Sequence, residues 1–338
     1  MSNNSDNTFF TNKFSHIYIE KEAFSYPLTE QILARFPKAK QIEVERYSEV
    51  FHRTRQHFQM QKRAMKLILA VKQPPFLYPG ADVCHDFGHS HFYYTSSALN
   101  CLYNCEYCFL QGMFPSAHTV FFVNIEDYFS AVSELLHQHP VYLCISYETD
   151  LLAFEGIAPF CRRWIDFARH HPDLLIELRT KSANISRLSK VEPAANVVLA
   201  WTLSPQAVIE RHEPGTPSLT ARLDAIEKAI RAGWPVRLCF DPLLHIDGWE
   251  EAYRECVEMT FSRLPGEAIR EVSVGSFRVP KDYMKRMRER RTDSPLLHYP
   301  FLCQDGVYRY PDGVNRRLTE HILRLIQKHI PEERIYTE

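Results

Sequence analysis

The stretch NCLYNCEYCFLQG, residues 100–112, spaces three cysteines as C-x3-C-x2-C. Thiolates bind iron–sulfur clusters, and complete protein ligation of a four-iron cluster takes four of them. Cys101, Cys105 and Cys108 are only three, so they predict a 4Fe–4S cluster with one iron open to a further ligand. S-adenosylmethionine (AdoMet) can occupy that iron through its amino and carboxylate groups. An electron from the cluster can then cleave the sulfonium and release a 5′-deoxyadenosyl radical, chemistry that proteins delegate to a cofactor.

Zinc is the main alternative for these cysteines. A zinc site normally takes four ligands, often as two C-x2-C pairs, and the sequence has no second pair. The other six cysteines are single residues, mostly in apolar segments where burial in the core is the usual outcome. They are Cys84, Cys144, Cys161, Cys239, Cys256 and Cys303. The open iron–sulfur cluster is therefore the favoured interpretation.

Strand-like and helix-like segments alternate from residue 97 onward. The predicted strands are 97–99, 141–146, 174–179, 196–203, 236–241 and 271–277. The predicted helices include 125–138, 157–171, 219–232 and 249–261. Such alternation predicts right-handed βαβ units and a parallel sheet. Six strands suit a partial (β/α)6 barrel of the TIM type, in which the cysteines directly follow the first strand.

The chain is expected to have three parts. Residues 1–96 form an N-terminal extension, 97–280 the partial barrel, and 281–338 a C-terminal cap with a basic helix and a β-hairpin. The extension is expected to be irregular, apart from a basic amphipathic helix over 52–72.

The composition is that of an ordinary globular enzyme, with 45% hydrophobic and 24% charged residues. The net charge of −1 gives no overall attraction to nucleic acid, so a DNA partner would need a local basic patch. The first residues lack the apolar core of a signal peptide, and no apolar stretch approaches the ~20 residues that span a bilayer. We therefore expect a cytoplasmic protein without membrane contact, whose nine cysteines are not a disulfide framework.

Polar side chains follow the predicted strands, at the end of the barrel where active sites lie. They are Tyr147, Glu148, Thr149, Asp150, Thr180, Lys181, Thr202, Ser204, Asp241, Ser276 and Arg278. Glu148 and Asp150 could form an acid/base pair, but binding of the cofactor's amino or ribose groups is the favoured role. Tyr107, beside the last cluster cysteine, can pack its ring against adenine.

The segment CHDFGHSHFYY places Cys84, His85, His89 and His91 within eight residues. Such side chains can share a second metal or bind substrate. The alternative is a loop of solvated or buried histidines.

Six basic residues lie within 281–291, and Tyr308, Arg309 and Tyr310 follow in the cap. Basic and aromatic side chains together suit phosphate contact and base stacking. A solvated helix face is the structural alternative.

Beyond the cluster motif, several blocks resemble the spore photoproduct lyase family of radical AdoMet enzymes, which reverts the thymine dimer of spore DNA without light. They are IYIEKEAFSYPLTEQIL (17–33), CLYNCEYCFLQ (101–111), RTK (179–181), IERHEPGTPSLTARLDAIEKAIRAGW (209–234), DPLLHIDGWEEAY (241–253) and VYRY (307–310). The likeness runs from about residue 16 to the C-terminus. The cysteine motif is typical of the whole superfamily, whereas the EPGT and DGW blocks indicate this family.

The resemblance implies cofactor and substrate contacts at matching positions. The three cysteines would hold the cluster, and AdoMet would be bound by Tyr107, Thr149, Lys181, Thr202 and Asp241. Asp150 is a further predicted AdoMet contact, because strand-end carboxylates of this fold often bind the cofactor. The hairpin would wedge into duplex DNA while the lesion is flipped into the site, with Arg278, Tyr308 and Arg309 as substrate contacts. A reducing partner such as flavodoxin or ferredoxin would supply the electron.

Two positions depart from the family pattern. Tyr147 stands where the family has the cysteine that returns a hydrogen atom to the product, and Phe109 stands where it has a tyrosine of the radical-return path. Strand alternation predicts that Cys144 faces away from Tyr147. Tyr147 itself is therefore a candidate for hydrogen return. A radical enzyme of the same fold acting on a small molecule, a modified base or a peptide is the alternative function.

Overall fold

The computed structural model describes residues 14–81 and 83–337. Its largest layer is an eight-stranded sheet of order β16-β12-β11-β10-β9-β8-β5-β4. Neighbouring strands are parallel from β16 to β5, and only the edge strand β4 is antiparallel. The strands are β4 (Tyr78–Pro79), β5 (Phe92–Tyr94), β8 (Val141–Cys144), β9 (Leu174–Thr180), β10 (Val197–Thr202), β11 (Val236–Leu243), β12 (Glu271–Ser276) and β16 (Ile335–Thr337).

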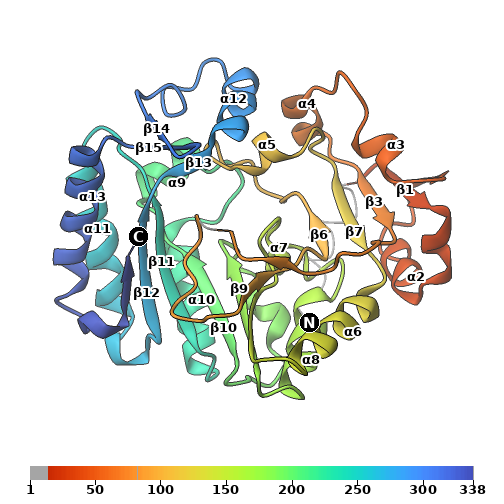
Figure 1. The fold of residues 1–338 in the computed structure, drawn as a ribbon, viewed down its shortest axis with the longest axis horizontal. Coiled ribbons are helices and arrows are strands. Elements are labelled where there is room, and N and C mark those ends of the chain that lie inside the picture. Colours follow the sequence, from red (N-terminus) through yellow and green to blue (C-terminus); the bar gives the residue numbers. More distant parts are fainter. Residues whose placement is uncertain (1–13, 82, 338) are drawn as a thin grey trace.

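Helices cover the outer face of this sheet, which curls around an inner face carrying the polar strand ends (Figure 1). They are α6 (Ile125–Leu136), α8 (Phe160–Arg169), α10 (Leu219–Arg231), α11 (Trp249–Arg263) and α13 (Asp312–Ile326). Each buries one stripe of apolar residues at helical spacing, as Phe160, Trp164, Ile165 and Ala168 do on α8. The predicted alternation of strands and helices is confirmed: β5 and β8 to β12 lie side by side in chain order.

The N-terminal extension is not irregular, and that expectation is wrong. A second sheet of order β2-β1-β3-β7-β6 takes three of its strands from it. These strands are β1 (His16–Glu20), β2 (Lys40–Val44), β3 (Leu67–Ala70), β6 (Ala98–Leu99) and β7 (Thr119–Phe122). Of the predicted helix over 52–72, only α4 (Phe58–Arg63) is helical, because α3 (Ser48–Phe51) ends before residue 52 and the last apolar residues of the segment form β3. Four consecutive apolar residues, LILA, fit a buried strand as well as a helix.

The predicted first barrel strand is also displaced. Residues 98–99 form β6, which pairs antiparallel with β7 in the second sheet, whereas β5 is the strand beside β8. A single bridge between Ser96 and Ser146 joins the segment after β5 to the end of β8. The cysteine loop therefore leaves from the junction of the two sheets.

The C-terminal cap contains the predicted hairpin. Strands β14 (Leu302–Gln304) and β15 (Val307–Arg309) pair antiparallel, and β13 (Arg278–Pro280) extends them to three strands. Helix α12 (Lys281–Arg290) follows β13 directly and lies next to α5 (Leu110–Met113), just after the cysteines (Figure 1). In the described residues no helix is long and apolar enough to cross a membrane.

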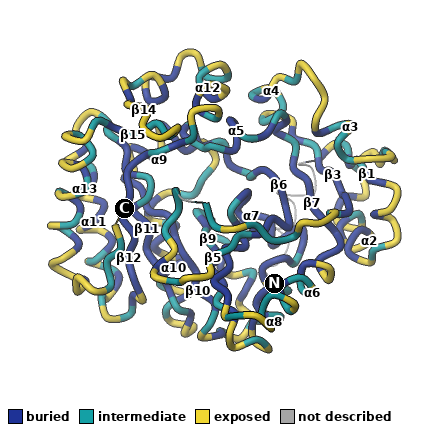
Figure 2. Tube along the Cα trace, viewed as in Figure 1, coloured by how far each residue is buried: buried dark blue, intermediate teal, exposed yellow. Residues whose placement is uncertain are grey.

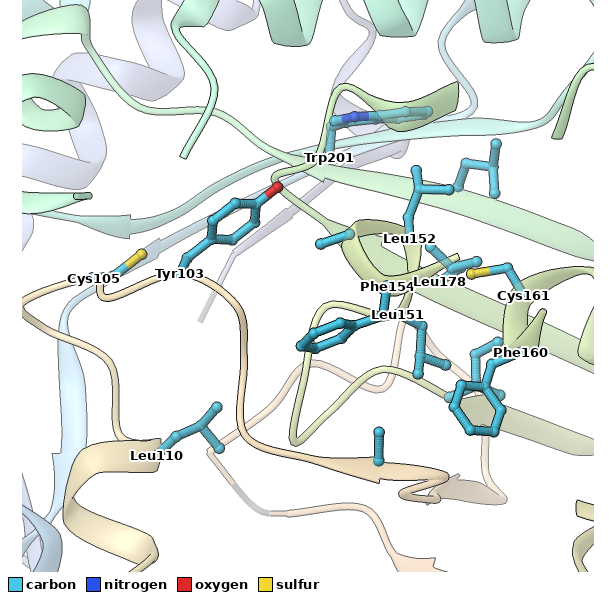
Figure 3. Packing of buried hydrophobic residues seen from close by; sticks show 14 of the residues in the cluster. Tyr103, Cys105, Leu110, Leu151, Leu152, Phe154, Phe160, Cys161, Leu178 and Trp201 are labelled. Carbon is cyan, nitrogen blue, oxygen red and sulfur yellow. The ribbon is translucent and has the colours of Figure 1, made fainter. Parts of the chain in front are cut away.

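The core reaches the cysteine loop. Buried chain runs through both sheets and the strand ends, while exposed chain is concentrated on the outer helices and the hairpin (Figure 2). Tyr103, Cys105 and Leu110 belong to the same apolar cluster as Trp201 and Phe160 of the barrel (Figure 3). Packing on this scale fixes the loop as part of the protein interior.

Candidate active site

The cysteine loop lies against the loop after α9 (Gln206–His212), which carries the EPGT sequence. The backbone N–H of Asn104 donates to Pro214 O at 3.1 Å, and that of Glu106 to His212 O at 2.7 Å. The Glu106 carboxylate also contacts His212 Nδ1 at 2.7 Å. Residues about 106 positions apart in the chain thus hold the loop in one conformation.

The donor set of this loop fits an iron–sulfur cluster. Among the described residues no three His, Cys, Asp or Glu side chains are already grouped around a metal position. The thiols of Cys101, Cys105 and Cys108 nevertheless lie within electrostatic reach of one another. Burial raises the pKa of Cys101 to about 12, so the thiol keeps its proton until a metal displaces it. Three thiols on one loop are the ligand set of a cluster with an open iron.

Three cations surround these thiols. Lys62, on α4, donates from Nζ to the carbonyl oxygens of Cys101 and Tyr103, at 2.5 and 2.9 Å. Lys181 and Arg291 lie close enough to influence the Cys105 thiol. Positive charge here suits the negative charge of three thiolates. Sequence analysis placed Lys62 and Arg291 in basic segments but not beside the cysteines, because only the fold brings them to the loop.

Glu213 of the EPGT sequence joins the cluster loop to the barrel. Its buried carboxylate accepts hydrogen bonds from the Tyr107 hydroxyl, from Ser204 Oγ at 2.8 Å and from the guanidinium of Arg222. Arg222 also donates to Thr202 O at 3.0 Å. The ring of Tyr107 is thereby fixed beside the ligands and next to the end of β10. Glu213 lies in the 209–234 segment that resembles the family, but it was not predicted as a site residue.

The charge of Lys181 completes this arrangement. Its Nζ lies 5.4 Å from the centre of the Tyr107 ring. Burial by itself lowers the pKa of Lys181, but Glu213 and Cys105 outweigh it and raise the pKa above its usual value. Burial likewise acts to raise the pKa of Glu213, yet Lys181 and Arg222 hold it at about 2. Both groups are therefore charged at neutral pH.

Asp150 and Thr149, both predicted cofactor contacts, make hydrogen bonds that hold the chain at the strand ends. Asp150 accepts hydrogen bonds from Thr180 Oγ1 at 2.7 Å, from the Lys181 N–H at 2.8 Å and from the Ala153 N–H at 3.1 Å. The last of these caps α7 (Leu151–Phe154). Thr149 Oγ1 donates to the carbonyl before the first cysteine, at 2.7 Å. A contact of either residue with AdoMet stays a prediction.

Asp241 and Arg278 form an ion pair, with Nη1 and Oδ1 3.0 Å apart. Arg179 lies on the other side of the same carboxylate at 3.6 Å. Arg278 also donates from Nε to Val83 O at 2.8 Å, so it holds the loop before Cys84. The predicted AdoMet and substrate roles of this pair stay predictions.

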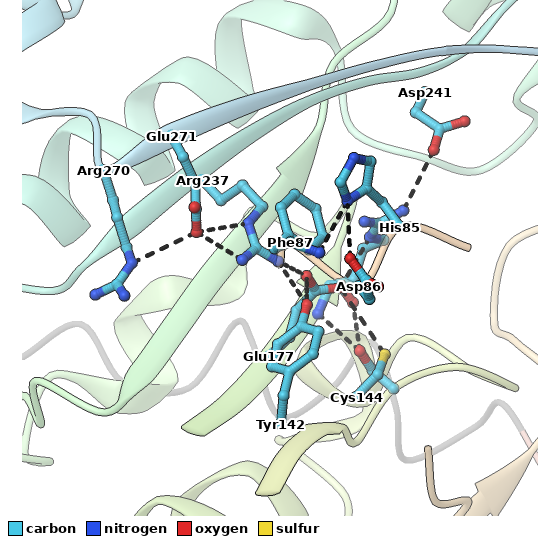
Figure 4. Close-up of polar contacts among 12 residues, drawn as sticks. His85, Asp86, Phe87, Tyr142, Cys144, Glu177, Arg237, Asp241, Arg270 and Glu271 are labelled. Atoms are coloured by element: carbon cyan, nitrogen blue, oxygen red, sulfur yellow. Dashed lines mark hydrogen bonds and ion pairs between the residues drawn. The ribbon is translucent and has the colours of Figure 1, made fainter. Parts of the chain in front are cut away.

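A buried ionic network supports the same loop from inside the barrel (Figure 4). Arg237 pairs with Glu177 and with Glu271, and it donates to the hydroxyl of Tyr142 at 2.7 Å. Its guanidinium lies 3.3 Å from the centre of the Phe87 ring. A stacked guanidinium with two carboxylates is a rigid support for residues 83–87.

That support places Cys84 beside Tyr147. Cys84 Sγ lies 3.8 Å from Tyr147 Oη and donates a weak hydrogen bond to it. The Tyr147 ring contacts Tyr94 and Phe109, with centroids 4.4 and 5.4 Å apart. Sequence analysis grouped Cys84 with nearby histidines and did not predict its contact with Tyr147.

The prediction that Cys144 faces away from this region is wrong. Strand β8 ends at Cys144, so alternation does not continue to Tyr147. Cys144 Sγ points toward Glu177 Oε1, 3.9 Å away, inside the barrel (Figure 4). Arg179 lowers the pKa of both Cys144 and Cys84 against the effect of burial, which places the two thiols in the same polar interior.

Comparison with known proteins identifies the family. The family model described as spore photoproduct lyase matches residues 12–291, which is most of the chain. The chain belongs to the spore photoproduct lyase family. It is therefore a lyase-type radical AdoMet enzyme.

Two curated spore photoproduct lyases match over most of their length. The one from Geobacillus sp. (strain Y412MC61) is 23% identical over 337 residues, covering 94% of this chain and 96% of its own. The one from Bacillus subtilis (strain 168) is 23% identical over 273 residues, covering 76% and 75%.

Solved structures of spore photoproduct lyase share the fold. A double mutant with bound AdoMet and dinucleoside spore photoproduct has a TM-score of 0.81 at 20% identity, covering 96% of this chain and 98% of that one. A complex with dinucleoside spore photoproduct has a TM-score of 0.80 at 19% identity, with the same coverage. These matches confirm the partial barrel.

Three arginines of α12 and its C-terminal cap have structural partners in this member of the spore photoproduct lyase family. Arg286 donates to Gly112 O, Arg290 to Phe114 O at 2.8 Å, and Arg291 to Asn104 O at 3.0 Å. Their guanidinium groups hydrogen-bond to the backbone around the cysteines, and a contact of these three with phosphate stays a prediction. Within the hairpin, Arg309 Nε is buried without a partner among the described residues.

The histidines after Cys84 hold no second metal in the described residues. His85 packs against Tyr336, with ring centroids 5.1 Å apart, and His91 stacks on His139 at 3.7 Å. These ring contacts favour the structural interpretation for His85 and His91, and substrate binding by the segment stays a prediction.

Proposed function

We propose that this chain binds a 4Fe–4S cluster and AdoMet and reverts the spore photoproduct, a covalently linked thymine pair, to two thymines in DNA. The observation that carries the proposal is the cysteine loop, fixed at the strand ends by Tyr107 and Glu213 and lined by cations. Family membership supports the reaction class. The family structures with bound AdoMet and dinucleoside spore photoproduct support the choice of substrate.

The chain's own residues would divide the work in this way. Cys101, Cys105 and Cys108 would hold the cluster, while Lys62 and Arg291 keep their loop in place. The cluster and AdoMet, when bound, supply a radical that takes one hydrogen atom from the substrate.

AdoMet would be held by side chains at the strand ends. Tyr107 would pack against the adenine, with its hydroxyl tied to Glu213. Lys181, Thr202 and Thr149 would contact the polar parts of AdoMet from the ends of β9, β10 and β8. Burial of this whole region keeps water away from a radical.

DNA is the proposed partner through the hairpin. Tyr308 and Arg309 lie on β15, and the unpartnered Nε of Arg309 suits an acceptor supplied by substrate. A reducing protein such as flavodoxin or ferredoxin would supply the electron. A cytoplasmic location is part of the proposal, since the nine cysteines of the described residues are all free.

A different substrate is the second candidate, and the observation that favours it is Tyr147 together with Phe109. In the family pattern these two positions hold a cysteine that returns a hydrogen atom to the product and a tyrosine of the radical-return path. Dinucleoside spore photoproduct separates the two candidates. Turnover of AdoMet without any release of thymine from this substrate would support the second.

The test is anaerobic reconstitution with iron and sulfide, followed by AdoMet cleavage under reducing conditions with dinucleoside spore photoproduct. We expect a brown protein that cleaves AdoMet and releases paired thymines. Cys105→Ala should lose both the colour and the cleavage. Cys256→Ala, on α11, is the matched control and should keep them. A colourless, zinc-binding protein would exclude the proposal.

A further inference from the structure

We propose that Cys84 gives the hydrogen atom that completes the repaired base, and that Tyr147 restores the Cys84 thiol. The inference rests on the proposed function and names two residues that carry out its last step. It follows from the contact between a thiol in the loop between β4 and β5 and a phenol just after β8, which are 63 positions apart in the chain.

The pair is held in place from three sides. The ion-paired Arg278 holds the carbonyl of Val83, next to Cys84. Three residues further on, Phe87 is stacked on Arg237. Tyr147 is packed between Tyr94 and Phe109. A donor that must meet a short-lived radical needs this kind of positioning.

Both groups carry a hydrogen atom at neutral pH. Burial raises the pKa of Cys84, and burial together with Cys84 raises that of Tyr147. Thiol S–H and phenol O–H bonds are weak enough to give up a hydrogen atom to a carbon or sulfur radical. The aliphatic O–H bond of serine is not.

The proposed steps balance in atoms and electrons. The S–H bond of Cys84 breaks and a C–H bond forms on the thymine methyl radical, leaving a thiyl radical. The O–H bond of Tyr147 then breaks and the S–H bond re-forms. The phenoxyl radical of Tyr147 would finally take back from 5′-deoxyadenosine the hydrogen atom that came from the substrate. The 5′-deoxyadenosyl radical left by this step would recombine with methionine to re-form AdoMet and return the electron to the cluster. No outside oxidant or reductant is consumed.

Cys144 is the rival donor, because it lies in the same interior. Its Sγ is directed at the Glu177 carboxylate, and it is 5% exposed, whereas Cys84 is only partly buried. The contact with Tyr147 belongs to Cys84. These differences favour Cys84 as the group that a bound substrate can reach.

The test uses the reconstituted full-length enzyme with dinucleoside spore photoproduct in D2O. S–H and O–H hydrogens exchange with solvent, whereas hydrogens on carbon do not. The wild type should therefore place one deuterium in the methyl group of a released thymine. Cys84→Ala and Cys84→Ser should both lose the label and lower the yield of repaired product by about two orders of magnitude, as expected when a positioned transfer group is removed.

Two further variants make the result specific. Cys144→Ala should keep the label and the yield. Tyr147→Phe should keep the label in the first turnover but lose later turnovers. AdoMet cleavage by each variant shows that it is folded and active in the first step.

The outcomes are distinct. The assignment would be overturned if Cys84→Ala kept the wild-type yield and labelling. It would also be overturned if only Cys144→Ala lost both. In either case the repair function would stand. A wild type that cleaves AdoMet but leaves the photoproduct intact would refute the repair function and the assignment together.

Discussion

Replacing Glu213 by glutamine removes the charge that joins the cluster loop to the barrel. The Glu213 and Arg222 side chains are fully buried and paired. Breaking a buried pair leaves an uncompensated charge, which costs about 3–5 kcal/mol. The pKa of Glu213 gives a similar figure, since lowering it from 4.5 to about 2 corresponds to about 3 kcal/mol of stability at pH 7.

The sign of the pH dependence follows from this lowered pKa. The contribution of Glu213 is fully present above about pH 4.5 and is lost as the pH falls toward 2. The penalty of Glu213→Gln should therefore be about 1 kcal/mol smaller at pH 3.5 than at pH 7. In a chain of 338 residues, a loss of 3–5 kcal/mol lowers the melting temperature by about 4–7 °C.

Urea unfolding followed by tryptophan fluorescence measures the effect at both pH values. Glu210→Gln, on an exposed position of α9, is the matched control and should change stability by less than about 0.5 kcal/mol. A Glu213→Gln protein as stable as the wild type would refute the reasoning. A penalty equal at the two pH values would show that the charge is not its cause.

Three further substitutions test the supports of the site. Lys62→Met leaves the Cys101 and Tyr103 carbonyls without their donor. The iron content after desalting should therefore fall, and the free energy of unfolding should fall by about 1–3 kcal/mol. Unchanged iron content would contradict this. Asp150→Asn weakens the N-terminal cap of α7 and should lower the free energy of unfolding by about 1–2 kcal/mol, as measured by thermal unfolding. An unchanged stability would show that the cap is unimportant. Arg237→Met leaves two buried carboxylates unpaired and should cost about 3–5 kcal/mol, whereas a more stable variant would show that the network is dispensable.

Local patterns in the sequence predicted much of the barrel. Five of its strands were recognisable because each is a short apolar run between segments of helical spacing, whereas the hairpin was predicted from the resemblance of VYRY to the family motif. The N-terminal sheet was missed because β1 and β3 pair across about fifty residues, and because LILA reads equally well as helix. Short apolar runs become strands only when a partner is present.

In the site, too, local sequence patterns predicted some features and missed those that depend on contacts between distant residues. Cysteine spacing alone identified the ligand set, since all three ligands lie within eight residues. The contacts of Tyr107 with Glu213, and of Cys84 with Tyr147, join positions 106 and 63 residues apart. No local pattern encodes such contacts. Arg290 and Arg291 were read as solvated or phosphate-binding for the same reason, because their carbonyl partners lie in the distant cysteine loop.

The measurement that tests the central claim most directly is the conversion of dinucleoside spore photoproduct by the reconstituted enzyme with AdoMet and a reductant. Product analysis by mass spectrometry follows the photoproduct, the released thymine pair and 5′-deoxyadenosine together. We predict that the photoproduct is consumed over many turnovers and that the thymine pair replaces it. Accumulation of 5′-deoxyadenosine with the photoproduct intact would contradict the claim.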